Sequence, residues 1–203
     1  MTSRRHVVII DSGGANLASL VYAFDRLGAS SVVSAAAAKI AAADRIVLPG
    51  VGNAASIMTR LEATGLIDVI RNLQCPVLGI CLGMQLLFEH SAEGPTTGLG
   101  LLKGRVEALV AREDRPVPHM GWNTLTKRKD DPLLHGLSAD DWFYFVHGYF
   151  APPDGEQVLA TTNYGDELAA VVRHRNFRGV QFHPERSSRS GARLLANFLD
   201  LTE

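Results

Sequence analysis

Short apolar runs alternate with amphipathic segments along the first ninety or so residues of the chain. Apolar, β-branched runs at 6–11 and 45–50 each end in a turn that contains glycine, and a weaker run covers 30–34. Between them, residues 16–28 repeat apolar side chains at helical spacing, and the alanine-rich residues 35–44 favour a short helix. Strands and helices in alternation predict a parallel sheet that is covered on both faces.

The same alternation continues through residues 53–90. Residues 53–73 predict one or two helices, with an interruption near Gly65. Residues 76–80 predict the next strand, and residues 82–90 predict the helix that follows it. These elements extend the parallel part of the sheet.

The pattern changes after residue 94. A glycine-rich loop is predicted at 94–100, and the apolar runs beyond it are strands with short connections, which form either hairpins or an antiparallel edge of the sheet. An amphipathic helix covers 188–201, and no repeat or linker marks a domain boundary. We therefore predict a single domain over 1–203 of the α/β class, with a mostly parallel central sheet flanked by helices and a mixed or antiparallel C-terminal portion. The later strand segments are 104–110, 142–147, 157–163, 168–173 and 177–183.

Composition leaves the predicted fold unchanged and excludes several classes of function. The chain has 203 residues, of which 46% are hydrophobic, and this suits one globular domain. Its formal net charge of −1 leaves no broad basic field for nucleic acid or an anionic membrane. No apolar run reaches the roughly 18–20 residues that span a bilayer, and no targeting leader is visible. We expect a soluble, cytoplasmic protein that binds neither nucleic acid nor membrane.

The two cysteines have no disulfide or zinc spacing, so no metal site is predicted. Cys81 lies between Gly79 and Gly83, where a strand is expected to turn into a helix. This is the layout of the G-x-S-x-G nucleophile elbow, in which bulky neighbours would clash, with sulfur in place of oxygen. The elbow points its side chain out at the carboxyl end of the sheet, where open α/β sheets bind ligands.

The predicted helix after Cys81 gives the sulfur a chemical role. Its dipole and free N–H groups favour a thiolate, and the N–H of Leu82 is placed to receive an oxyanion. A buried structural cysteine is the alternative interpretation of Cys81. Cys75, which precedes a proline at a strand entrance, is predicted to be inert.

A general base for this thiolate is predicted in the segment GVQFHPERS, residues 179–187. An apolar run brings His183 to a strand end, and Glu185 follows two residues later. In an extended chain these two side chains lie on the same side, so Glu185 can orient the imidazole and complete a triad. Taken alone, His183 is equally well explained as a histidine in a surface turn.

The segment LPGVGNAAS, residues 48–56, adds a second candidate oxyanion donor. It follows a predicted strand, and Gly50 and Gly52 allow its backbone to approach a ligand closely. The N–H of Val51 is the expected donor. An ordinary Pro-Gly turn is the alternative.

Together, the segments GICLGMQ, PGVG and GVQFHPE resemble the class I glutamine amidotransferases, in the order that this family has them. The resemblance covers nearly the whole chain and implies a flavodoxin-like α/β fold, no cofactor, and a γ-glutamyl thioester on Cys81 that releases ammonia and glutamate. It makes Cys81, His183 and Glu185 the catalytic triad. The implied glutamine contacts are Gly50, Gly52, Gln85, His147, Gly148 and Tyr149.

Within that family, five segments are similar to glutaminase subunits that serve a separate (β/α)₈ barrel cyclase in a heterodimer. The partner uses the ammonia to make imidazole glycerol phosphate and an aminoimidazole carboxamide ribotide in histidine biosynthesis. The segments are 11–20, 48–54, 119–123, 144–150 and 179–188. The implied partner contacts are Asn16, Trp122, Asn123, Tyr144 and Arg186.

Four residues depart from the pattern of that group. Ser12 and Ala15 replace an aromatic residue and a glycine at the expected partner face. Gly148 replaces a hydroxyl residue, so one glutamine contact is expected to rest on backbone alone. Arg186 replaces a lysine, and its forked guanidinium is not equivalent to a point charge.

Three other functions stay open at this point. One is the glutaminase subunit of anthranilate or aminodeoxychorismate synthase, although those more often carry a histidine where Met84 stands. Another is a catalytically silent scaffold, against which the intact triad argues. The last is a cysteine hydrolase or peptidase built on a similar sheet.

Overall fold

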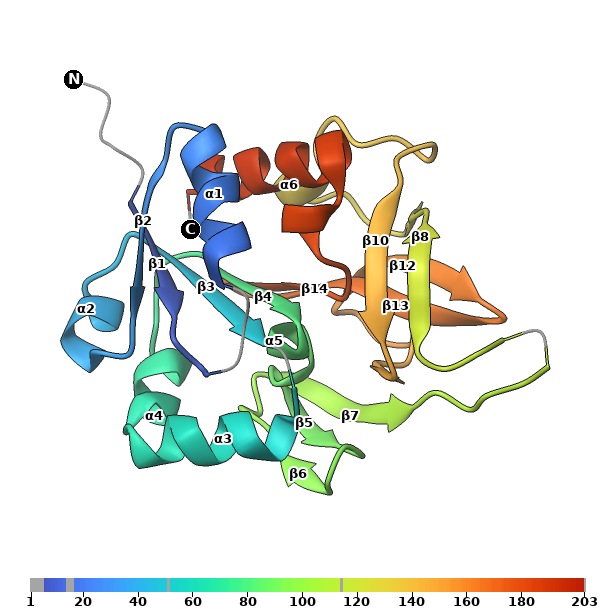
Figure 1. Ribbon diagram of the computed structural model, residues 1–203, viewed down its shortest axis with the longest axis horizontal. Coiled ribbons are helices and arrows are strands. Elements are labelled where there is room, and N and C mark those ends of the chain that lie inside the picture. The colour runs from blue at the N-terminus through green and yellow to red at the C-terminus, as the bar shows by residue number, and fades with distance from the viewer. Residues whose placement is uncertain (1–5, 14–16, 51, 114, 203) are drawn as a thin grey trace.

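The computed structural model describes residues 6–13, 17–50, 52–113 and 115–202. In this part of the chain, one eight-stranded sheet runs through the molecule, parallel in its first five strands and antiparallel in the last three (Figure 1). This confirms the predicted fold class. Of the strands expected after residue 94, those over 157–163 and 168–173 lie in an antiparallel edge of this sheet, whereas the one over 177–183 lies parallel within it. In spatial order the strands are β2 (Ser30–Ser34), β1 (His6–Ile10), β3 (Arg45–Gly50), β4 (Val77–Cys81), β14 (Phe177–Val180), β13 (Asp166–His174), β12 (Val158–Tyr164) and β9 (Thr126–Lys127).

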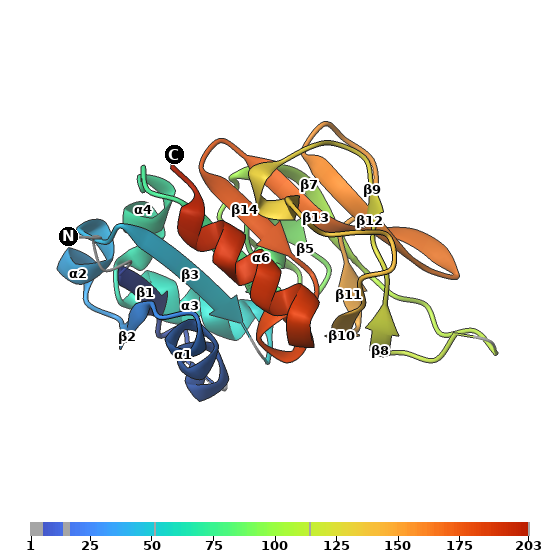
Figure 2. The ribbon, with the colours of Figure 1, turned by 90° about the horizontal axis from the view of Figure 1, so that it is seen from above.

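Helices cover both faces of the sheet because its central strands are apolar on both sides. In β1, for example, Val7 and Ile9 belong to one buried cluster, whereas Val8 and Ile10 belong to the other. Figures 1 and 2 show α1 and α6 on one face, and α3 and α4 on the opposite one. The helices are α1 (Leu17–Arg26), α2 (Ala37–Ala41), α3 (Ala54–Ala63), α4 (Leu66–Arg71) and α6 (Ser188–Asp200).

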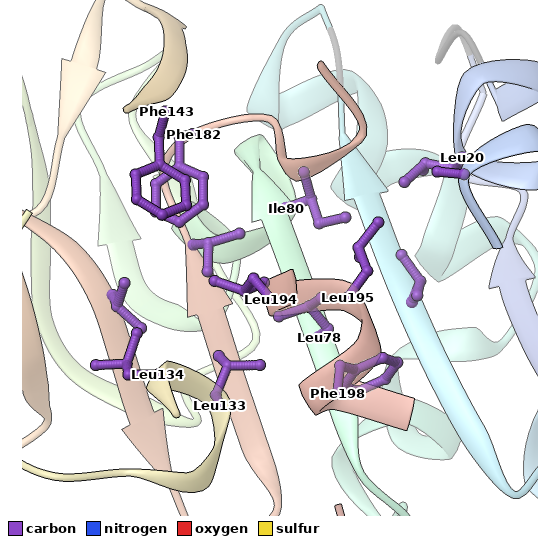
Figure 3. Packing of buried hydrophobic residues seen from close by; sticks show 14 of the residues in the cluster. Leu20, Leu78, Ile80, Leu133, Leu134, Phe143, Phe182, Leu194, Leu195 and Phe198 are labelled. Carbon is purple, nitrogen blue, oxygen red and sulfur yellow. The ribbon is translucent and has the colours of Figure 1, made fainter. Parts of the chain in front are cut away.

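The C-terminal helix α6 is packed by its apolar stripe. Leu194, Leu195 and Phe198 are buried against Leu78 and Ile80 of β4, the strand that ends at Cys81 (Figure 3). This packing holds the central strand firmly beneath the site. No helix in the described part of the chain is long and apolar enough to cross a membrane.

Two smaller sheets extend the molecule beyond the main one. One pairs β8 with β10, and the other has the order β11-β7-β5-β6. The β8–β10 pair is tied to the end of the main sheet by the His183 N–H, which donates to the Tyr144 carbonyl at 2.9 Å. The remaining elements are β5 (Phe88–Ser91), β6 (Thr96–Thr97), β7 (Leu102–Ala108), β8 (His119–Asn123), β10 (Phe143–His147), β11 (Tyr149–Phe150), and the short helices α5 (Leu82–Gln85), η1 (Pro132–Leu134) and η2 (Pro184–Arg186).

The predicted helix over 82–90 is wrong in its length. Helix α5 ends at Gln85, and β5 begins at Phe88. The carbonyls of Leu86 and Leu87 accept hydrogen bonds from backbone N–H groups in 99–102 instead of continuing the helix. Two related predictions also need correction, because the expected loop at 94–100 contains β6, and the strand expected over 177–183 ends at Val180.

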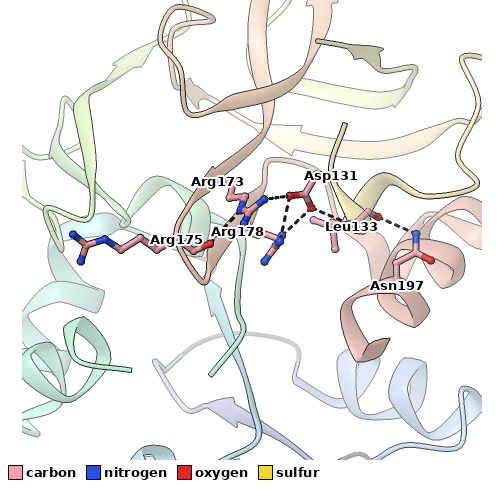
Figure 4. A network of polar contacts seen from close by, with 6 residues as sticks. All are labelled: Asp131, Leu133, Arg173, Arg175, Arg178 and Asn197. Atoms are coloured by element: carbon pink, nitrogen blue, oxygen red, sulfur yellow. Dashed lines mark hydrogen bonds and ion pairs between the residues drawn. The ribbon is translucent and has the colours of Figure 1, made fainter. Parts of the chain in front are cut away.

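Arg178 is a buried cation in the middle of β14. Its Nε donates to Oδ1 of Asp131 at 2.8 Å, and its Nη2 to Oδ2 at 3.2 Å (Figure 4). Asp131 also accepts from Arg173 Nη1 at 2.9 Å and from the N–H of Leu133 at 2.9 Å. This carboxylate therefore joins two strands of the sheet to η1.

Replacing Asp131 with alanine is expected to lower the free energy of unfolding by about 3–5 kcal/mol, because it leaves a buried guanidinium unpaired. Asp130→Ala is the matched control, since Asp130 is exposed. Urea unfolding of both variants measures the difference. Equal stability of the two alanine variants would contradict a structural role for this ion pair.

Candidate functional site

Cys81 ends β4 in a strained backbone conformation, with φ 53° and ψ −112°. Residues other than glycine rarely adopt such a positive φ, and such strain gathers at functional sites. The turn is as tight as its glycines predict. A Cβ on Gly83 would lie 1.8 Å from the Leu48 carbonyl oxygen, and one on Gly79 would lie 2.7 Å from that of Gly83.

A pocket of about 370 Å³ opens at this end of the sheet. Cys81, His183 and Glu185 line it together, so the structure brings all members of the predicted triad to one place. Leu82 lines it as well, whereas Val51 lies outside the described residues. All the predicted glutamine contacts line this pocket: Gly50, Gly52, Gln85, His147, Gly148 and Tyr149.

His183 and Glu185 are in direct contact, as predicted, but not for the predicted reason. Nδ1 of His183 lies 2.8 Å from Oε1 of Glu185, and both side chains are buried. The strand has already ended at Val180, and the two residues meet through the turn of η2 and not along an extended chain. Pro184 therefore starts a tight turn that brings the carboxylate back to the imidazole.

The environment of His183 favours its charged form. Burial opposes protonation, but hydrogen bonds and electrostatic attraction from Cys81 and Glu185 outweigh it and raise the pKa of His183 from 6.5 to about 10. At neutral pH the site therefore holds an imidazolium between a sulfur and a carboxylate. This arrangement favours a thiolate nucleophile.

The raised pKa of His183 predicts how hydrolysis of an amide substrate depends on pH. Because the folded site stabilises the imidazolium, that stabilisation is complete below about pH 6.5 and is lost as the pH rises through about 10. We expect kcat/KM to fall with an alkaline midpoint near pH 10. Glu185→Gln removes one of the causes of the raised pKa, so its alkaline midpoint is expected at lower pH.

A pH–rate profile over about pH 6–11 makes this measurement. An activity that rises as His183 loses its proton near pH 6.5 would contradict the charged resting state.

The helix after Cys81 contributes less to stabilising a thiolate than the sequence predicts. Because α5 spans only Leu82–Gln85, it lacks the length that gives a strong helix dipole. Polar side chains surround the sulfur in place of a long helix. His183 lines the same pocket as the sulfur, and Nε2 of Gln181 lies 3.8 Å from Sγ.

The pocket wall around Tyr149 is built from hydrogen bonds. The Tyr149 carbonyl accepts from Nε2 of Gln85 at 2.9 Å, and it lies 2.8 Å from Nδ1 of His147. Because this carbonyl is an acceptor, Nδ1 of His147 carries the proton, and Nε2 accepts from Nδ1 of His119 at 3.0 Å. Burial lowers the pKa of His147 to about 3 and that of His119 to about 4, so both rings are neutral.

Three residues of this region were missed by sequence reasoning. Glu93 lines the pocket, where its Oε2 also accepts from the N–H of Ala54 at 2.8 Å. Gln181 and His119 lie behind the lining residues and reach it only through other side chains. Gln181 lies inside the quoted GVQFHPE segment, whereas nothing in the local pattern around Glu93 marked it.

Three of the residues predicted to meet a partner, Trp122, Asn123 and Tyr144, lie on β8 and β10. Trp122 is 49% exposed, and its ring packs edge-on against Tyr144 at 5.9 Å. Met120 on the same strand is 63% exposed. Arg186 lies at the pocket itself, Asn123 is held by a hydrogen bond to the Asn163 carbonyl, and Asn16 lies outside the described residues.

One of the departures noted above has a structural explanation, and two do not. Ser12 is buried, and its hydroxyl donates to the Pro49 carbonyl at 3.0 Å, so it supports the strand that ends at Gly50. Gly148 offers its carbonyl to the Leu109 N–H, and a Cβ there would meet only Val117 at an ordinary 3.8 Å. Nothing in the structure explains Arg186 in place of lysine. Ala15 lies outside the described residues.

Among the described residues, no group of three or more histidine, cysteine, aspartate or glutamate side chains is placed to hold a metal ion.

Comparison with known proteins gives a consistent result. The family model described as glutamine amidotransferase class-I matches residues 8–201. A protein from Xanthomonas axonopodis pv. citri, named imidazole glycerol phosphate synthase subunit HisH, is 49% identical over 196 residues, which are 97% of this chain and 98% of that protein. The protein of the same name from Mannheimia succiniciproducens is 46% identical over 194 residues, covering 96% and 99%.

Solved structures share the fold. A crystal structure of a glutamine amidotransferase has a TM-score of 0.74 at 23% identity and covers 96% of this chain and 97% of that one. The structure of PurLQS from Thermotoga maritima has a TM-score of 0.73 at 19% identity, with 98% and 99% covered. At these identities the likeness concerns the fold alone.

Proposed function

Since this chain belongs to the class I glutamine amidotransferase family, we propose that it is the glutaminase subunit of imidazole glycerol phosphate synthase in cytoplasmic histidine biosynthesis. It hydrolyses glutamine to glutamate and ammonia. One observation carries the proposal: the pocket that holds Cys81, His183 and Glu185 is lined by every described residue expected to contact glutamine. The near full-length identity to relatives of that name supports the biosynthetic role.

The reaction starts from the thiolate of Cys81 beside the imidazolium of His183. The sulfur attacks the side-chain amide carbon of glutamine, and the N–H of Leu82 receives the oxygen that becomes negative, with Val51 proposed as a second donor. His183 then gives its proton to the leaving nitrogen, which departs as ammonia and leaves a γ-glutamyl thioester. Water attacks this thioester, His183 takes its proton, and glutamate leaves Cys81 as a thiolate again.

The rest of the pocket suits the remainder of the glutamine molecule. Glu93 places a carboxylate in the pocket, and this charge is complementary to the α-ammonium group of glutamine. Gly50 and Gly52 keep their part of the pocket wall free of side chains. Gln85, with both N–H groups already used by the protein, presents its oxygen as an acceptor.

We assign the partner to the side formed by β8 and β10. Met120, Trp122 and Tyr144 form an apolar and aromatic surface beside the pocket, and exposed apolar patches of this kind commonly bind other proteins. A (β/α)₈ barrel cyclase docks there as the second half of a heterodimer. Asn16, Asn123 and Arg186 are proposed as further contacts.

Glutamate release measures this function directly. The chain is assayed alone, with the barrel cyclase, and with the cyclase and its nucleotide substrate. We expect the highest rate in the complete complex, because ammonia released without an acceptor is lost. Chorismate-using synthase subunits serve as the control partners, and activation by them instead of the cyclase would contradict the assignment.

A further inference from the structure

Gln181 is a fully buried amide that joins the nucleophile to the wall of the glutamine pocket. It follows β14, and its backbone N–H donates to the Ala170 carbonyl at 2.9 Å, which fixes the start of its side chain. Its Oε1 lies 3.0 Å from Nε2 of Gln85. Its Nε2 lies 3.8 Å from Sγ of Cys81, within reach of a hydrogen bond to sulfur.

The direction of both amides follows from one backbone carbonyl. The Tyr149 carbonyl can only accept, so Gln85 must turn its NH₂ group toward it. The second N–H of that group then donates to Gln181, which must accept through its side-chain carbonyl oxygen. Flipping either amide would set two acceptors or two donors against each other. Gln181 is therefore left with its N–H groups on the side of Cys81.

The other groups around the sulfur come from different elements, and Gln181 adds a donor to them. His183 and Glu185 approach from η2, and neutral His147 lines the pocket from β10. The Val146 carbonyl, at 3.8 Å from Sγ, can accept from a thiol but gives no stabilisation to a thiolate. Since α5 is only one turn long, side-chain donors matter more here than in an elbow followed by a long helix.

We propose that Gln181 is a catalytic residue of the glutaminase reaction, which donates an amide N–H to the Cys81 thiolate, with Tyr149 and Gln85 setting the direction of that amide. This inference rests on the proposed function for its reaction. The negative sulfur exists before attack on glutamine and again when glutamate leaves. A fixed donor at that atom favours both states and costs no rearrangement during turnover.

Alkylation of Cys81 by iodoacetamide as a function of pH tests this without any substrate. The parent is Cys75→Ala, so that Cys81 is the single cysteine of the chain. Gln181→Met keeps the length of the side chain and removes the donor. A hydrogen bond to a charged group is worth roughly tenfold or more in an equilibrium, so the alkylation midpoint is expected to rise by about one pH unit.

Two further variants make the result specific. Gln157→Met is the matched control, because Gln157 lies outside the pocket and donates to the Lys103 carbonyl. Gln85→Met does not touch the sulfur, but it frees Gln181 to turn, so its midpoint is expected to rise as well. If thermal unfolding shows that Gln181→Met does not fold, Gln85→Met is the variant that tests whether Gln181 donates to the sulfur.

Glutamate release by the cyclase complex is measured in parallel. An unchanged alkylation midpoint in folded Gln181→Met, or in Gln85→Met where the former does not fold, would overturn the role of Gln181. If Gln181→Met shifts the alkylation midpoint but the parent complex releases no glutamate, the proposed function is overturned and the role of Gln181 as a donor to the thiolate stands. The expected pattern is a higher midpoint and a roughly tenfold lower kcat in Gln181→Met, with Gln157→Met equal to the parent.

Discussion

Replacing Cys81 with alanine is expected to abolish glutamate release, with a loss on the order of 10⁶ in kcat, because the thioester can no longer form. The strained elbow exists to present this one atom to the pocket, and none of the other described side chains lining the pocket carries a sulfur. The cyclase should keep its full rate with free ammonia, since the acceptor chemistry lies on the partner chain.

Cys75→Ala is the matched control for this experiment. Cys75 lies before β4 and outside the site pocket, and burial raises the pKa of its thiol, so it is poorly suited to attack. Its removal should leave glutamate release nearly unchanged. Near-normal glutaminase activity in Cys81→Ala would mean that the nucleophile has been assigned wrongly.

His183→Ala is expected to be almost as damaging as loss of the nucleophile, because members of a triad act as a unit. Without the imidazole, the sulfur loses the cation beside it, and the leaving nitrogen loses its proton donor. We expect a loss of roughly 10⁴–10⁶ in kcat.

Glu185→Gln should cost less than His183→Ala. Glu185 orients the imidazole through a 2.8 Å contact, and its second oxygen is buried with no hydrogen-bond partner among the described residues. Glutamine keeps the orienting oxygen but removes the charge, so the imidazolium becomes easier to deprotonate. Steady-state glutamate release in the complex measures both variants. A larger loss in Glu185→Gln than in His183→Ala would reverse the roles assigned to them.

The sequence predicts the order of the elements well where the apolar pattern is strong. The strands that end at Gly50 and Cys81 stand out because they are apolar and closed by glycine, and these two strands position the nucleophile. The elbow was predictable for the same reason, since a Cβ on Gly79 or Gly83 would lie less than 3 Å from neighbouring backbone atoms.

Elements failed to follow from the sequence where distant backbone groups decide the structure. Nothing local shows that the carbonyls of Leu86 and Leu87 will pair with 99–102 and end α5 at Gln85. The contact between His183 and Glu185 was predicted correctly, but it depends on a turn that the extended pattern does not contain.

The site is predictable to the same extent. The residues proposed to carry the chemistry themselves, such as Cys81 and His183, stand out by type and setting. Gln181 and Glu93 do not, because their roles depend on what lies opposite them in the folded chain: a sulfur one hundred residues away in the first case and the pocket in the second.

The fate of the glutamine nitrogen tests the central claim most directly. The complex with the barrel cyclase and its nucleotide is given glutamine labelled with heavy nitrogen at its amide, in the presence of excess unlabelled ammonium. The imidazole product is then examined by mass spectrometry. We predict that the heavy nitrogen appears in the imidazole ring with little dilution, and that Cys81→Ala gives only unlabelled product. Unlabelled product from the intact complex, with no glutamate released, would contradict the account.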